Sequence, residues 1–462
     1  MKLNEKSNTV KYVLISCGVI LIVACLCLSA VLLSGIGVSM LWPFNFPESS
    51  TQIPISTPVS DLPVSDLPDQ LAGTIAEIES QVVQIRGLKK EQSVEYTLIS
   101  AEELEQIVVE DFFSEYSGQD AYQDVLVLSS LGLLPGDFDL KGFYEALYSE
   151  QIAGFYNEET KEIYVVQGQD FGGTEKLTYA HEFTHVLQDQ VYGLNEGLGM
   201  NEEVCEEDSE RCAAVQALIE GDASQTEILW FQTYASMEDY RDLMDMFDLL
   251  HTPVLDSAPP YMAADMYFPY EQGLAFVQYL YDQGGYETID KAFVDLPVST
   301  EQILHPEKYP DDAPLRVTLP DLSANLGGSW TLFDQNVMGE WYTYLILNKA
   351  FEKRYRIPEE TAQGAAEGWG GDAYAIYLNE NTDETIFMME SLWDTTEDAQ
   401  AFVDAFEQYA SRRWEPISET LSGARIWQSP DVSVAFWHED DRTLWVMAPN
   451  DDLLQTIISE LQ

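Results

Sequence analysis

The sequence predicts an α+β protein with an N-terminal transmembrane helix, a mainly helical domain with a small sheet, and a C-terminal α+β layer. Three observations lead to this prediction. Residues 12–38 are apolar, contain no charged residue and are long enough to span a bilayer. Residues 70–364 carry mostly helical periodicity, whereas residues 365–462 alternate strand patterns with amphipathic helices. Since 46% of the residues are apolar, the chain can build a hydrophobic core.

The N-terminal segment has the features of an uncleaved membrane anchor. Three lysines lie in residues 1–11 and none follows the apolar stretch closely, so the positive-inside rule places residues 1–11 in the cytoplasm. A signal peptide would have a shorter apolar region with a cleavage site soon after it. Lipidation at Cys25 is the alternative, because Ile22–Cys25 resembles a bacterial lipoprotein box. We expect a single-pass protein of the cell membrane whose C-terminal part lies outside.

The composition of the chain after the apolar stretch indicates a linker and a strongly acidic surface. Residues 39–69 are rich in Pro and Ser and contain PVSDL twice, which predicts an extended linker. The chain has 80 acidic and 22 basic residues and a formal net charge of −58. A nucleic-acid partner is excluded, because neutralising phosphates requires clustered Lys and Arg.

Two cysteines in the predicted outer part, Cys205 and Cys212, flank an acidic run. On one continuous helix their Cα atoms would lie about 10 Å apart, which is too far for a disulfide. A bridge therefore requires a loop between them. We expect a disulfide in an oxidising compartment, and two free thiols are the alternative.

The helical domain begins with local signals for helices and one hairpin. Residues 71–85 form an amphipathic helix pattern, and a second helix begins at Ser100, where Glu103 completes a capping box. Residues 154–167 contain two β-rich runs around a polar turn, which predicts a hairpin. Its second strand, Ile163–Val166, leads into the next helix.

That next helix carries a metal-binding motif. We expect Thr174 to be its N-cap and Gly193 to end it. It contains the sequence HEFTH, in which His181 and His185 lie four residues apart and therefore project from one face. Two imidazoles one turn apart suit a single Zn²⁺. Glu182 points in a different direction and can serve as a base without being a ligand.

A third ligand is expected from Glu220, which lies among apolar and small residues on a later helix. A carboxylate buried there needs a partner, and basic residues are scarce, so a metal is favoured over an ion pair. Asp222 is the alternative ligand. Small residues such as Ala217 and Gly221 would let this helix approach the first one closely. We expect Asp222 and Asp189 to accept hydrogen bonds from the ligand imidazoles.

HEFTHVLQD followed by EGDA resembles the gluzincin branch of the zinc metallopeptidases. Together with GFY, YEQGLAFVQYL and STEQILHP, these segments resemble a group of membrane-anchored zincin-like proteins of bacteria and archaea, over residues 75–440. The resemblance implies a zincin-like catalytic domain at residues 70–364. It implies these roles: His181, His185 and Glu220 as zinc ligands, and Glu182 as the residue that activates water. One departure is Ser224, where the gluzincin pattern has Asp.

Peptide hydrolysis also needs a donor to the developing oxyanion. Tyr270, at the start of a helix, and His305, in a predicted loop, are the candidates. A core aromatic is the alternative for Tyr270, and a structural hydrogen bond is the alternative for His305. Glu340, an acid in an apolar helix, is a weaker candidate. Zincins commonly bind peptide along an edge strand, and we expect Ile163–Val166 to be that strand.

The sequence of the C-terminal region, residues 365–462, predicts several strands and two helices. An amphipathic helix begins near Thr395, and a last helix follows the final strand. We expect the helices to cover one face of the sheet. The glycine-rich residues 368–372 predict a tight turn. They lack the Lys and Ser or Thr of a phosphate-binding loop.

Two function classes follow from these patterns. The first is a membrane-anchored, extracytoplasmic zinc peptidase that acts on peptide or protein substrates. The second is a non-catalytic cell-surface binding module with a structural zinc site. Glu182 favours the peptidase, because a structural site needs no base and normally has four protein ligands.

Overall fold

The computed structural model describes residues 67–100, 103, 106, 116–151, 154–157, 160–166, 171–249, 252–421 and 423–461. The fold is α+β, as predicted. The expected cytoplasmic tail (1–11), membrane anchor (12–38) and nearly all of the linker (39–69) lie outside the described residues, as does the lipidation candidate Cys25. In the part of the chain that is described, no helix has the length and apolar character needed to cross a membrane.

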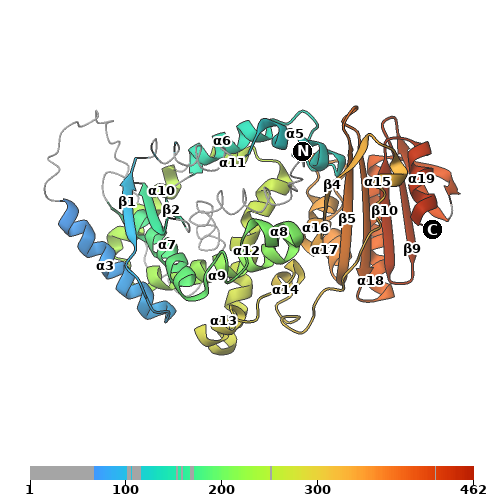
Figure 1. The fold of residues 1–462 in the computed structure, drawn as a ribbon. Helices are drawn as coiled ribbons and strands as arrows, with labels where there is room; N and C mark the ends of the chain where they lie inside the picture. The colour runs from blue at the N-terminus through green and yellow to red at the C-terminus, as the bar shows by residue number, and fades with distance from the viewer. Residues whose placement is uncertain are drawn as a thin grey trace, which may run out of the picture.

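The first part of the described chain is mainly helical (Figure 1). Its helices are α3 (Leu67–Arg86), α5 (Gly118–Ser130), α6 (Leu140–Gln151), α7 (Gly173–Tyr192), α8 (Glu202–Glu207), α9 (Ser209–Tyr234), α10 (Met237–Leu249), α11 (Pro253–Asp256), α12 (Pro260–Gly284), α13 (Tyr286–Ala292) and α14 (Thr300–Leu304). The long helix α9 packs between α7 and α12, and α3 packs against α7. The capping box of Ser100 and Glu103 is present, but most of the helix predicted after it lies outside the described residues.

Two glycines set the distance between α9 and α12. A Cβ atom on Gly221 would lie 2.2 Å from the carbonyl oxygen of Gly273, and one on Gly273 would lie 2.1 Å from that of Ala217. Real Cβ atoms do not approach backbone this closely, so both positions require glycine. The small residues around Glu220 therefore admit α12. The expectation that Gly221 serves the approach of the metal-binding helix was wrong, because this residue faces α12. For Ala217 it stays a prediction.

A three-stranded sheet lies beside α7. It consists of β1 (Glu95–Ile99), β2 (Gly154–Asn157) and β3 (Glu162–Val166) in the order β1-β3-β2. The antiparallel pairing of β2 with β3 confirms the predicted hairpin. Because β1 pairs with β3 in parallel, β3 is the central strand, and the prediction that Ile163–Val166 forms an edge was wrong. Among the described strands, β2 is the edge strand that packs against α7.

Helix α7 begins two residues earlier than predicted. Gly172 is the N-cap, and its N–H donates to the Glu175 side chain at 3.0 Å, so Thr174 lies inside the first turn. The helix ends at Gly193, as predicted, with a φ of +71° that favours glycine.

The disulfide between Cys205 and Cys212 is present. Cys205 lies in α8 and Cys212 in α9, and the helical conformation is interrupted between them at Asp208. The Asp208 side chain accepts from the backbone N–H of Arg211 at 2.9 Å and thereby starts α9. The break brings the two Cα atoms to 5.6 Å, which a continuous helix cannot do.

The second part of the chain is built around a seven-stranded antiparallel sheet in the order β4-β5-β6-β10-β9-β8-β7. Its elements are α15 (Ser323–Leu326), β4 (Trp330–Asn336), α16 (Gly339–Asn348), α17 (Glu359–Ala366), β5 (Trp369–Asn379), β6 (Thr385–Trp393), α18 (Thr396–Arg413), β7 (Glu415–Leu421), β8 (Ala424–Ser429), β9 (Val432–Glu439), β10 (Arg442–Ala448) and α19 (Asp451–Leu461).

Three predictions for this part were incomplete or wrong. Since β4 pairs with β5, the sheet starts before the predicted boundary at residue 365. Helices cover both faces of the sheet, with α18 on one face and α15 and α19 on the other, because side chains on both faces are apolar. Of the predicted turn at residues 368–372, only Gly368 lies in a turn, and residues 369–372 form the irregular start of β5, with a register shift between Trp369 and Gly371.

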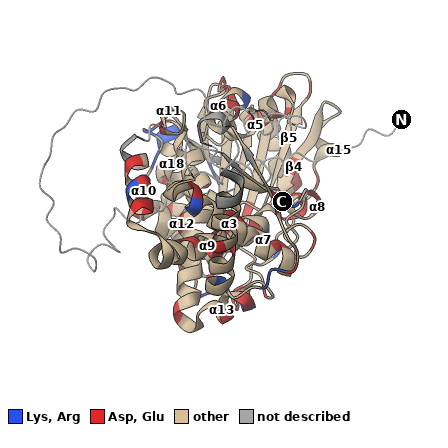
Figure 2. Ribbon diagram, turned by 90° about the vertical axis from the view of Figure 1, so that its left-hand side faces the viewer, with Lys and Arg blue, Asp and Glu red and all other residues tan. Residues whose placement is uncertain are grey.

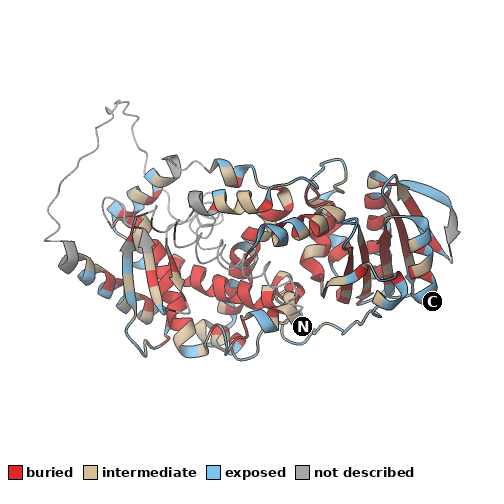
Figure 3. Cartoon of the chain, turned by 45° about the horizontal axis from the view of Figure 1, so that its top comes forward, coloured by how far each residue is buried: buried red, intermediate tan, exposed pale blue. Residues whose placement is uncertain are grey.

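One hydrophobic cluster joins the two parts. It extends from Leu128 in α5 through α9, α12 and α16 to Trp445 in β10. Figure 3 shows buried positions both in the helices of the first part and in the strands of the sheet. The acidic residues lie mainly on helices and loops at the surface, where basic residues are few (Figure 2). Most of the acidic charge therefore belongs to the surface, although some acids, such as Glu182, Glu220 and Glu227, are buried.

Candidate metal centre

Helices α7 and α9 cross so that His181, His185 and Glu220 meet in the interior. The coordinating atoms of all three side chains lie within 4.8 Å of one another, and all three residues are buried. His181 Nε2 lies 3.2 Å from Glu220 Oε2, and His185 Nε2 lies 3.4 Å from the same oxygen. Two imidazole nitrogens and one carboxylate oxygen form a donor set that zinc prefers. The structure thus brings together the three ligands that the sequence predicted.

Each imidazole is oriented from behind by a second polar contact. His181 Nδ1 lies 2.8 Å from a carboxylate oxygen of Glu227, and His185 Nδ1 lies 2.8 Å from Oε1 of Gln188. A carboxylate oxygen only accepts hydrogen bonds once ionised, so Nδ1 of His181 is the donor. The other nitrogen, Nε2, is then left with the lone pair that a metal requires.

Among the described residues, the buried atoms around the centre that lack a hydrogen-bond partner include His185 Nε2 and Glu182 Oε1. An unpaired polar atom in the interior is costly, and native proteins satisfy such atoms with a protein group, water or an ion. A zinc ion held by these three residues would satisfy the nitrogen, and a water molecule beside it would satisfy the carboxylate oxygen. The residues present therefore fit a zinc site.

Glu182 is held in place by the small sheet. Its Oε2 accepts a hydrogen bond of 3.0 Å from the backbone N–H of Tyr156 in β2. Burial raises the pKa of Glu182 to about 7, against the opposing charges of His181 and His185. The carboxyl group is thus poised to gain or lose a proton near neutral pH, as a general base must.

The three candidate ligands shift one another's pKa values. Burial alone would lower the pKa of His181, but the hydrogen bonds that it donates to Glu220 and Glu227 raise this pKa well above its usual value. Burial also lowers the pKa of His185, but the charge of Glu220, the hydrogen bond to it and the charge of Glu182 together raise this pKa above its usual value. Burial would raise the pKa of Glu220, yet the two imidazolium charges lower it to about 2. The centre therefore attracts positive charge, as protons or as a metal ion.

The predicted acceptors Asp189 and Asp222 do not touch the imidazoles. Asp189 accepts from the Tyr156 hydroxyl at 2.7 Å and from Lys161 Nζ at 2.6 Å, so it holds the β2–β3 hairpin against α7. Asp222 reaches His185 only through Gln188, whose side-chain nitrogen donates to Asp222 at 2.9 Å. It is also not among the grouped ligand atoms, which favours Glu220 over the alternative ligand.

Sequence reasoning missed Glu227 and Gln188 as the direct partners. The pattern did contain a signal for Glu227, which lies seven residues after Glu220 and therefore on the same face of α9. Ser224, at the position where the gluzincin pattern has Asp, is buried but is not the partner of His181.

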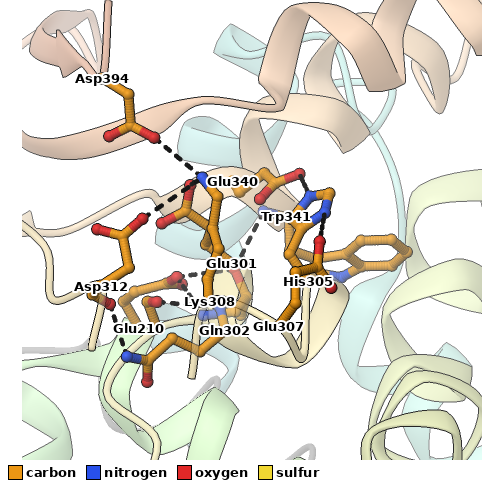
Figure 4. Close-up of polar contacts among 12 residues, drawn as sticks. Glu210, Glu301, Gln302, His305, Glu307, Lys308, Asp312, Glu340, Trp341 and Asp394 are labelled. Carbon is orange, nitrogen blue, oxygen red and sulfur yellow. Dashed lines mark hydrogen bonds and ion pairs between the residues drawn. The ribbon is translucent and has the colours of Figure 1, made fainter. Parts of the chain in front are cut away.

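Of the two oxyanion candidates, Tyr270 lies at the centre. It is 1% exposed, and its ring centroid lies 6.4 Å from that of His181. His305 lies at the end of α14, where its Nε2 is 2.9 Å from Glu340 (Figure 4). Among the described residues, no hydrogen bond, ion pair or ring contact joins His305 or Glu340 to the ligands or to Glu182. His305 therefore pairs with Glu340, away from the candidate metal ligands.

A second acidic group near His305 has the spacing of a cation site. Its members are Glu301, Asp312 and Asp394. Lys308 Nζ lies 2.6 Å from Glu301, 2.9 Å from Asp394 and 3.7 Å from Asp312 (Figure 4). The ammonium group occupies the position that a metal would take, so this group is an ion-pair network.

Comparison with known proteins gives one match. Residues 331–458 match a family described as a domain of unknown function (DUF8575). The comparisons with curated proteins and with solved structures give no match. The matched range runs from β4 into α19 and contains none of the candidate ligands. The chain is therefore similar to the DUF8575 family over its C-terminal sheet and its covering helices.

Proposed function

We propose that the chain is a membrane-anchored, extracytoplasmic, zinc-dependent peptidase. The observation that carries this proposal is the buried centre in which His181, His185 and Glu220 converge beside the unpaired Oε1 of Glu182. A purely structural zinc site would normally have a fourth protein ligand and no adjacent base. Both features favour catalysis over the non-catalytic binding module.

In this proposal zinc, when bound, acts as a Lewis acid that polarises a peptide carbonyl and acidifies water. The protein groups handle the proton. Glu182 accepts it at Oε1 as water attacks the carbonyl carbon, and then delivers it to the departing amine. The other carboxylate oxygen of Glu182, Oε2, still accepts the hydrogen bond from the Tyr156 N–H. This hydrogen bond keeps Oε1 directed at the centre. Tyr270 is the proposed donor to the oxyanion.

The open edge of β2 is the proposed docking line for a peptide substrate. Because the Tyr156 N–H points at Glu182, this edge of the strand faces the centre and not β3. An extended peptide can bond to such an edge through its main chain and place a carbonyl near the base. Asp189 fixes this edge through the Tyr156 hydroxyl and Lys161.

A peptide-library digest tests the proposal. We expect the full-length chain to cleave peptides, to lose this activity with a zinc chelator and to regain it when zinc is restored. His185→Ala, which removes a ligand, should bind little zinc and show no cleavage. A chain that holds one zinc ion at these residues and cleaves no peptide would favour the structural-zinc binding module instead.

A further inference from the structure

Arg86 is a buried cation that the proposed chemistry does not use. It is the last residue of α3 and is 0% exposed. Its Nε lies 2.7 and 2.9 Å from the two carboxylate oxygens of Asp222 in α9, and its Nη1 lies 2.7 Å from Asp290. The guanidinium group also lies 4.7 Å from the ring centroid of Tyr286. These contacts hold the Asp222 carboxylate in one orientation.

Asp222 in turn fixes the side-chain amide of Gln188. Nε2 of Gln188 donates to Asp222 at 2.9 Å and to the carbonyl oxygen of Ile219 at 3.0 Å. The Ile219 carbonyl and the Asp222 carboxylate, which is paired with Arg86, can both only accept hydrogen bonds. The side-chain nitrogen of Gln188 must therefore face them. The amide oxygen then faces His185.

This orientation decides the tautomer of His185. Oε1 of Gln188 lies 2.8 Å from His185 Nδ1 and can only accept, so Nδ1 carries the proton. Nε2 is left as the free lone pair of the neutral ring, and it is the atom that has no hydrogen-bond partner. If the amide turned over, it would donate to Nδ1, and the proton of His185 would move to Nε2.

We propose that Arg86 is a positioning residue for the metal ligand His185, acting through Asp222 and Gln188. The inference rests on the proposed zinc site. A buried Arg–Asp pair adds little net stability compared with apolar side chains of the same size, because desolvation offsets the attraction. Fixing the amide of Gln188 gives this pair a role that an apolar pair cannot perform. Groups that support a ligand in this way typically affect metal affinity by about 10- to 100-fold.

Zinc titration of the full-length chain against a competing chelator tests the proposal. Arg86→Met keeps the length of the side chain but frees Asp222, and we expect its zinc Kd to rise about 10- to 100-fold. Asp290→Asn is the matched control. It weakens the other ion pair of the same guanidinium group and leaves Asp222 untouched, so its Kd should stay within about twofold of the parent.

A nitrogen NMR measurement on the zinc-free protein separates positioning from general stability. The chain has five histidines, so ¹⁵N-labelled imidazoles can be resolved and assigned. At alkaline pH we expect His185 of the parent to carry its proton on Nδ1, and Arg86→Met to populate the Nε2–H tautomer. Because no metal is present, this readout is independent of hydrolysis and of zinc binding.

Asp222→Asn provides a second variant if Arg86→Met does not fold. An Asn amide can donate to Gln188 and so permit the turned orientation, and we expect the same direction of change in both readouts. A folded variant with parental zinc affinity and a parental His185 tautomer would overturn the inference. A protein with the predicted tautomers but no peptide hydrolysis would contradict the proposed function and leave the inference standing.

Discussion

At the residue scale, Glu227 determines which nitrogen of His181 faces the metal. Its carboxylate lies 2.8 Å from Nδ1 and is fully buried. We expect Glu227→Ala to raise the zinc Kd about 10- to 100-fold, since the imidazole loses the group that fixes its orientation and basicity. Glu238→Gln, an exposed change on α10, is the control and should have the parental Kd. Equal affinities in both variants would show that Glu227 does not orient the ligand.

The proton equilibria of the ligands predict a pH dependence of zinc binding. Both His181 and His185 have raised pKa values in the metal-free protein, so each holds a proton to higher pH than a free imidazole. Zinc must displace these protons. Affinity should therefore fall as pH decreases through neutrality, by about tenfold per unit for each displaced proton. A zinc Kd that stays constant as pH falls from about 8 to 6 would contradict pKa values raised above the ordinary imidazole value of about 6.5.

Which site residues the sequence revealed depends on how local the information is. His181, Glu182 and His185 lie within one helix, where spacing alone fixes their directions. Glu220 stood out because an acid in an apolar helix needs a partner. The supporting groups depend on how α7, α9 and the hairpin cross, which no local pattern records. Asp189 was therefore assigned to an imidazole although it holds β2.

At the scale of elements, the α9–α12 contact depends on Gly221. Ala normally stabilises a helix relative to Gly by about 1 kcal/mol. At Gly221 the added methyl group would collide with the Gly273 carbonyl, so we expect Gly221→Ala to destabilise the protein by about 1–3 kcal/mol. Urea unfolding measures the change. The matched control is Gly364→Ala in α17, where nothing lies within 4 Å and stability should rise.

A stabilising effect of Gly221→Ala equal to that of Gly364→Ala would show that α9 and α12 are not held at this distance. The same contact positions Glu220 and Tyr270, which lie on these two helices. A destabilised variant should therefore also bind zinc less tightly than the parent.

Elements with strong periodicity were predicted, and elements defined by distant pairing were not. The helices at 71–85 and 396–413, and the 154–167 hairpin, each follow from their own residues. The central position of β3 depends on β1, which precedes it by more than sixty residues of chain. Likewise β4 joins the C-terminal sheet across two intervening helices, so the boundary could not be placed from pattern alone.

At the scale of the whole molecule, the formal net charge of −58 predicts self-repulsion within the folded chain. Figure 2 shows acidic residues on many helices and loops of the chain. Added salt shortens the screening length from about 10 Å at 0.1 M to about 3 Å at 1 M, so repulsion should weaken. We expect the melting temperature to rise by several degrees as NaCl increases to molar concentration. A melting temperature that stays flat or falls over this range would contradict a stability limited by charge.

The central claim is that the three ligands hold zinc for catalysis with Glu182 as the base. Hydrolysis by Glu182→Gln, measured beside its zinc content, tests this claim most directly. Glutamine keeps the shape of the side chain but cannot accept the proton of the attacking water. The account predicts one zinc ion per chain, a parental melting temperature and hydrolysis reduced by at least about 100-fold. Peptide hydrolysis at the parental rate by the zinc-loaded variant would contradict it.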